Sequence, residues 1–131
     1  MKHRNERGAA AVEFAILLPV LMLILFGTIE FGLIMYFREV ITNASREGAR
    51  SGIVQNTVKP TAGEIQTVVT NFLTGTGLDP NAVTINIAGA GLTAPNTLTV
   101  TVTYPYTFFV PGILGLGNTL TLTGQTVMRH E

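Results

Sequence analysis

The longest apolar run of the sequence most strongly limits what the chain can fold into. Between Ala9 and Phe37 the only acidic or basic residues are Glu13 and Glu30, and the stretch from Phe14 to Ile29 carries no charge at all. A helix that spans a membrane needs about 20 mostly apolar residues, each adding about 1.5 Å. The run therefore predicts one helix able to cross a bilayer.

A short basic head precedes this run and contains Lys2, Arg4 and Arg7. Such a head is typical of a cleaved secretory signal peptide and also of a retained membrane anchor. Signal peptides have an apolar core of about 7–15 residues and then a small-residue cleavage site, whereas this run is longer and no such site follows Phe26. We therefore favour an anchor. Basic residues are equally frequent on both sides, so charge does not orient the helix; the short head favours a cytoplasmic N-terminus.

Composition excludes several other classes of protein. Only 12% of the 131 residues are charged, with 8 basic and 8 acidic residues, against about 25% in soluble domains. The apolar share of 47% excludes a disordered tail, and the lack of basic excess argues against nucleic-acid binding. The absence of cysteine excludes a disulfide framework and a cysteine–zinc site.

The residues that enzymes need are scattered. His3 and His130 lie at opposite ends, in no metal-ligand spacing, and neither a cysteine nucleophile nor a G-x-S-x-G motif is present. We therefore expect no catalytic activity, no metal and no cofactor.

Glu13 is an unusual residue at the start of an apolar helix. A carboxylate in the middle of a membrane costs about 2.5–3.5 kcal/mol on insertion scales, so such residues usually have a partner. Glu13 either lies at the level of the lipid headgroups or pairs with a specific group. Glu30 lies seventeen positions further on, about 25 Å along a straight helix, and is either an interfacial carboxylate or a residue that faces a partner.

The segment around Glu13 resembles a prepilin processing site. Arg7 to Phe14 read RGAAAVEF, and the apolar run is followed by TNASREGAR; later segments read YPYTF, GNTLTL and VMRHE. Together these segments resemble the TadE-like family, minor pilins (pseudopilins) of the Tad/Flp branch of type IV pili. The resemblance covers nearly the whole chain, and its first part is the most specific.

This resemblance implies how the chain is processed and assembled. A prepilin peptidase would cut between Gly8 and Ala9, and Glu13 and Phe14 would be the acidic–aromatic pair that follows the cut in this family. Glu13, Phe14 and Glu30 would serve in assembly or recognition. The implied partners are the inner membrane, that peptidase, the major pilin, other pseudopilins and the assembly platform. A membrane-anchored adhesin that is never processed, and a secreted binding domain, remain as alternatives.

Small residues recur every four positions after the apolar run, at Ala44, Gly48 and Gly52. This spacing forms a stripe on one helix face, which lets another backbone approach closely. Charged neighbours place the stripe outside the bilayer. It therefore packs on the chain's own sheet, which we favour, or on a partner.

The remaining pattern predicts a small α+β head. A capping box of Thr61 and Glu64 begins a helix whose expected buried stripe is Ile65, Val68, Val69, Phe72 and Leu73. From Val83 onward apolar residues alternate with polar ones, which predicts an antiparallel meander. Its inward residues include Leu98, Val100, Val102, Tyr104, Leu120 and Leu122, with a bulge possible after Gly124.

These patterns and the resemblance together divide the chain into three regions. The resemblance implies a leader in residues 1–8, and we expect a transmembrane and amphipathic helix in residues 9–54 and an extracytoplasmic head with one further helix in residues 55–131. The apolar loop before the last strand contains Phe108, Phe109, Ile113 and Leu114. We expect these side chains to cap the small core; alternatively they form a contact patch for a neighbouring subunit or the membrane surface.

Overall fold

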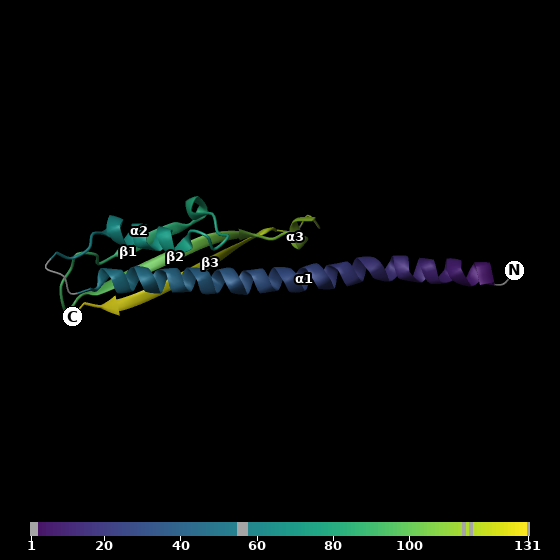
Figure 1. Cartoon of the computed structure of the whole chain (residues 1–131), viewed down its shortest axis with the longest axis horizontal. Helices are drawn as coiled ribbons and strands as arrows, with labels where there is room; N and C mark the ends of the chain where they lie inside the picture. The colour runs from purple at the N-terminus through teal and green to yellow at the C-terminus, as the bar shows by residue number, and fades with distance from the viewer. Residues whose placement is uncertain (1–2, 55–57, 114, 116, 131) are drawn as a thin grey trace. The chain divides into compact units, whose positions relative to one another are not determined.

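The computed structural model describes residues 3–54, 58–113, 115 and 117–130. The elements in chain order are α1 (His3–Gly52), α2 (Ala62–Leu73), the 3-10 helix η1 (Pro80–Ala82), β1 (Thr84–Ala88), β2 (Thr97–Thr107), α3 (Val110–Ile113) and β3 (Thr119–Arg129) (Figure 1). Pro19 lies inside α1, and the helix continues past it. The predicted α+β class, with a long N-terminal helix, one further helix and an antiparallel sheet, is confirmed.

The chain divides into two compact units. The first consists of Met1–Leu33 and Phe108–Asn118, and the second of Ile34–Thr107 and Thr119–Glu131. Helix α1 therefore contributes residues to both units. The sequence-based division after residue 54 follows the end of α1, whereas the second compact unit begins within that helix.

The second unit contains an antiparallel three-stranded sheet in the order β1-β2-β3. Its register pairs Ile85 with Val102 in β1 and β2, and Val102 with Gly124 in β2 and β3. The predicted inward residues Leu98, Val100 and Val102 are fully buried, and Leu122 is also buried. Because side chains alternate between faces, one face of the sheet is apolar and the threonines of β2 lie on the other.

Two helices cover the apolar face of this sheet. The buried residues of α1 in this unit recur with helical spacing: Val40, Ile41, Ala44, Ser45, Gly48, Ala49 and Gly52. Those of α2 are Ile65, Val69 and Leu73. Such periodicity gives each helix one buried stripe.

The small residues of α1 lie where this helix meets α2 and β2. A Cβ atom built on Gly48 would come 2.5 Å from Val69 Cγ2, and one built on Gly52 would clash with Leu98 Cδ2. Ala44 is fully buried. The stripe thus lies against the chain's own helix and sheet.

Three details of the expected core were wrong. Phe72 is 41% exposed and Leu120 is 38% exposed, because the buried stripe of α2 is narrower than five positions and because β3 is less covered near its start. The expected bulge after Gly124 is absent from the described sheet, since β2 and β3 pair without interruption from Thr97↔Arg129 to Thr107↔Thr119.

Gly124 instead provides space for helix α1. A Cβ atom at this position would lie 2.8 Å from the main-chain carbon and oxygen of Ile41 and from the nitrogen of Thr42. Strand β3 and helix α1 therefore touch backbone to backbone. Two residues further along, the hydroxyls of Thr126 and Ser45 are hydrogen-bonded at 2.7 Å, which adds a polar link to the same helix.

The end of β3 is fixed by a buried histidine. His130 is 1% exposed; its backbone N–H donates to the Asn96 carbonyl at 3.0 Å, and its Nε2 lies 3.0 Å from the Gly89 carbonyl oxygen. A carbonyl only accepts, so Nε2 carries the proton in this arrangement. Nδ1 has no hydrogen-bond partner among the described residues.

The predicted capping box at the start of α2 is present. The Thr61 hydroxyl accepts from the Glu64 backbone N–H, and the Glu64 carboxylate accepts from the Thr61 backbone N–H at 2.7 Å. The Thr61 hydroxyl also donates to Glu64 Oε2 at 3.0 Å. The bond from the Thr61 backbone N–H, and after it the bond from the Thr61 hydroxyl, lower the pKa of the Glu64 carboxyl below 4.5. Because the pKa of Glu64 is lower in the folded state than in the unfolded state, these bonds stabilise the folded state at pH values above the unfolded-state pKa. This stabilisation is lost as the pH falls through the folded-state pKa.

Thr61→Ala is expected to weaken this cap. Loss of an N-cap hydroxyl typically lowers the free energy of unfolding by about 1 kcal/mol, and the pKa of Glu64 should rise towards 4.5 because one of its donors is gone. Chemical denaturation of the full chain in detergent, with NMR titration of Glu64, measures both effects. An unchanged Glu64 pKa would contradict the assigned role of the hydroxyl.

Candidate membrane and assembly helix

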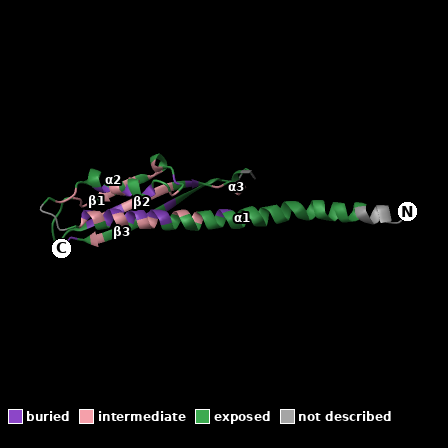
Figure 2. Cartoon of the chain, in the orientation of Figure 1, coloured by how far each residue is buried: buried purple, intermediate pink, exposed green. Residues whose placement is uncertain are grey.

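The part of α1 in the first unit is an apolar helix with an uncovered surface. Residues 8–29 are all exposed, and Figure 2 colours this stretch as exposed along its length. Apolar area left in water costs about 25 cal/mol per Å², and a helix that is apolar all round belongs in lipid or inside a larger assembly. Within Gly8–Gly52, α1 is long and apolar enough to cross a membrane.

The proposed processing site lies within this helix. Gly8 and Ala9 are both exposed, and a Cβ atom on Gly8 would meet no described atom within 4 Å. Glycine costs about 1 kcal/mol relative to alanine in a helix interior. Packing within the described chain therefore gives no reason for glycine at position 8.

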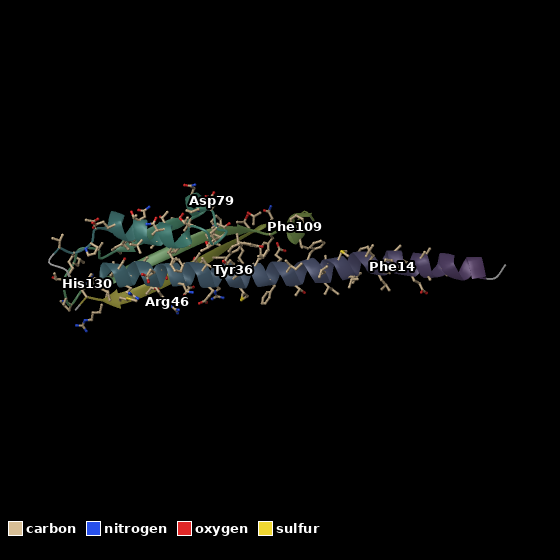
Figure 3. All side chains as sticks on the ribbon, viewed as in Figure 1. Phe14, Tyr36, Arg46, Asp79, Phe109 and His130 are labelled. Carbon is tan, nitrogen blue, oxygen red and sulfur yellow. The ribbon has the colours of Figure 1, made fainter. Side chains whose placement is uncertain are left out.

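The acidic–aromatic pair lies one turn further along the helix. Glu13 and Phe14 are exposed, Phe14 to 61% (Figure 3). Consecutive residues point about 100° apart on a helix, so these two side chains present a carboxylate and an aromatic ring on neighbouring faces. Both are accessible to a partner.

Glu30 is the buried carboxylate of the first unit, with 7% of its surface exposed. Its Oε1 accepts a hydrogen bond from the Phe109 backbone N–H, and its Oε2 accepts one from the Val110 N–H at 3.3 Å. These donors lie at the start of α3, where backbone N–H groups have no partner within the helix. Glu30 thus binds the loop between β2 and β3 to helix α1.

The aromatic residues of the loop between β2 and β3 differ in burial and in their contacts. Phe109 (Figure 3) is 65% exposed. Its ring centroid lies 6.2 Å from that of Phe26. Phe108 is half-buried, and its N–H donates to the Asn118 carbonyl at 2.7 Å. Leu114 and the side chain of Ile113 lie outside the described residues. The expectation that the loop caps the core does not describe Phe109, whose contact is with the apolar helix.

Tyr36 lies near the end of the apolar run and takes part in the second unit. Its hydroxyl donates to the Thr76 carbonyl at 3.1 Å, and its ring centroid lies 5.4 Å from that of Phe37. Phe37 in turn lies against Tyr104 and Tyr106 of β2. An aromatic cluster therefore covers α1 just beyond the apolar stretch.

The sequence did not reveal the partners of Glu30, because they lie 79 and 80 positions away. One signal was present: a carboxylate in an apolar helix requires donors. A metal is not indicated as the partner, because no group of three or more His, Cys, Asp or Glu suited to a metal ion occurs among the described residues.

The comparison with protein families bears on this same helix. Residues 8–50 match the model of the family described as TadE-like protein. This segment is TadE-like. The resemblance inferred from the residues is thus confirmed over the stretch that contains Gly8, Glu13 and Glu30. Comparison with curated proteins and with solved structures gave no match.

The TadE-like match suggests a protein associated with a Tad pilus. The apolar part of α1 also fits a single-pass membrane anchor. The family match and the candidate membrane span thus fall on the same helix.

Proposed function

We propose that this chain is a minor pilin (pseudopilin) of a Tad pilus, inserted in the bacterial inner membrane and cut between Gly8 and Ala9. The observation that carries the proposal is the exposed Glu13, five residues after Gly8, at the start of an apolar helix with an uncovered surface. The TadE-like match begins at residue 8, which supports the same boundary. The head would be extracytoplasmic and the N-terminus cytoplasmic.

In this role the chain is a substrate of an enzyme and has no activity of its own. Its partners would be the prepilin peptidase, the major pilin, other pseudopilins and the assembly platform. Cleavage would create an amino group at Ala9. Glu13 of a neighbouring subunit can then pair with that cation as the helices stack, and the pair fixes the axial register between subunits.

Intact-mass measurement of the protein extracted from membranes tests the proposal. Loss of Met1–Gly8 is the result expected for a pilin. A full-length chain would instead support an anchored adhesin that is never processed, and loss of the entire stretch 1–37 would support secretion.

Glu13→Ala is expected to leave cleavage intact but to prevent incorporation into pili. Removing one partner of a desolvated ion pair costs about 3–5 kcal/mol, which is a hundredfold or more in an equilibrium constant, at about 1.4 kcal/mol per tenfold. The measurement is the ratio of processed protein in sheared pili to that in the membrane.

Val12→Ala provides the matched control. Val12 is also exposed, to 60%, and carries no charge, so its truncation should leave incorporation unchanged. Incorporation of Glu13→Ala at the wild-type level would refute the pairing.

A further inference from the structure

The loop between β2 and β3 has the composition of a segment that lies in lipid. From Phe108 to Asn118 it contains no charged residue, and the nearest acidic or basic residues in the sequence are Asp79 and Arg129. Phe109 is 65% exposed, and among the described residues its ring lies against that of Phe26. An exposed apolar loop of this kind requires an explanation.

The position of the loop along α1 indicates what surrounds it. Phe109 lies beside Phe26, with ring centroids 6.2 Å apart. Phe26 is seventeen residues after Ala9, about 25 Å along a helix that rises about 1.5 Å per residue. The hydrocarbon core is about 30 Å thick. If the span begins at Ala9, the Phe109 ring therefore lies at the depth of acyl chains.

Four described backbone donors of the loop are hydrogen-bonded within the first unit, which lowers the cost of placing them in lipid. The Phe109 and Val110 N–H groups donate to Glu30, the Phe108 N–H to the Asn118 carbonyl, and the Gly115 N–H to the Gly112 carbonyl at 3.3 Å. Glu30 in turn receives two donors, which reduces the cost of a carboxylate at this depth. The Glu30 carboxylate and the loop backbone thus satisfy each other's hydrogen-bonding groups.

We propose that the Phe109 end of the loop between β2 and β3 inserts into the outer leaflet beside α1, so that the chain contacts the bilayer at a second place. The exposed side of Phe109 contacts lipid acyl chains, because the neighbouring Phe26 belongs to the proposed membrane span. The inference rests on the membrane anchoring in the proposed function. Neither cleavage nor assembly is needed for it.

Depth-dependent fluorescence quenching tests the proposal in the full chain. The sequence has no cysteine, so single variants Phe109→Cys, Ile16→Cys and Val127→Cys can each carry one environment-sensitive fluorophore. The proteins are reconstituted in phosphatidylcholine–phosphatidylglycerol vesicles that contain lipids spin-labelled along the acyl chain. Ile16 reports on the helix, and Val127, two residues from Arg129, is exposed in the second unit.

The label at residue 109 is expected to be quenched as strongly as the label at residue 16, and the label at residue 127 much less. Quenching at residue 16 without quenching at residue 109 would overturn the inference and leave the anchor intact. Absence of quenching at residue 16 would overturn the anchor itself and the inference with it. Disulfide-linked dimers of the unlabelled Phe109→Cys variant, with no quenching of the labelled one, would overturn the lipid contact and assign the patch to a second copy.

A second variant tests the contribution of Glu30. Glu30→Ala leaves the Phe109 and Val110 N–H groups without their acceptor, so the label at residue 109 should move to a shallower depth while the label at residue 16 keeps its depth. Glu39→Ala, which removes an exposed carboxylate further along α1, should change neither. An unchanged depth at residue 109 in Glu30→Ala would refute the role of the carboxylate.

Discussion

Gly8→Leu is expected to leave residues 1–8 attached to the chain. The proposed cleavage requires a peptidase site that accepts glycine, and forcing extra methylenes into a closely fitting site costs about 1–3 kcal/mol, occasionally more. This corresponds to about a 5- to 150-fold loss of cleavage rate. Intact mass of the membrane-extracted protein, followed over time after synthesis, measures the loss.

The structure separates this effect from misfolding. A Cβ atom at Gly8 meets no described atom within 4 Å, and leucine favours helix more than glycine does, so the fold of the chain gives no reason for a loss. Gly27 is equally open in the same helix, and Gly27→Leu is therefore the matched control, with cleavage expected at the wild-type rate. Normal cleavage of Gly8→Leu would show that the cut lies elsewhere.

Gly124→Ala is expected to destabilise the second unit strongly. The added methyl would lie 2.8 Å from main-chain atoms of Ile41 and Thr42, and a backbone cannot rotate away as a side chain can. Overpacking of this kind costs about 1–3 kcal/mol and occasionally more. Chemical denaturation of the full chain in detergent, followed by circular dichroism, should show an unfolding midpoint well below that of the wild type.

Two other glycines provide the comparison. Gly52→Ala meets the ends of the Leu98 and Ile65 side chains, which can adjust, so its loss should be smaller than that of Gly124→Ala. Gly63 is exposed in α2 with no described atom within 4 Å of a Cβ, and Gly63→Ala should stabilise by about 0.5–1 kcal/mol. The same loss at all three positions would mean that the backbone contact at Gly124 is unimportant.

Local patterns predicted the elements of this fold well. The apolar run, the Thr61–Glu64 capping box and the alternation in β2 depend on residues close together in sequence. The repeat of Ala44, Gly48 and Gly52 likewise indicated that α1 needs space beside it. Each of these features is visible because a helix or strand repeats its exposure with a fixed period.

Contacts between distant segments were the part that local patterns could not predict. Gly124 interrupts an alternation, which suggested a bulge, but its actual neighbour is the main chain of Ile41, far away in the sequence. Glu30 is a similar case in the candidate site, because its two donors belong to a loop that follows β2. A single sequence marks such residues as unusual without naming what they touch.

The backbone contact at Gly124 also has a mechanical consequence. Where a strand and a helix are separated by side chains, a pulling force can be absorbed by rotamer changes before the layers slip. At Gly124 the main chains of β3 and α1 are in direct contact, and the Ser45–Thr126 hydrogen bond lies next to it. Tension along α1 therefore reaches β3 as shear with little slack, a property that the proposed incorporation into a pilus would use.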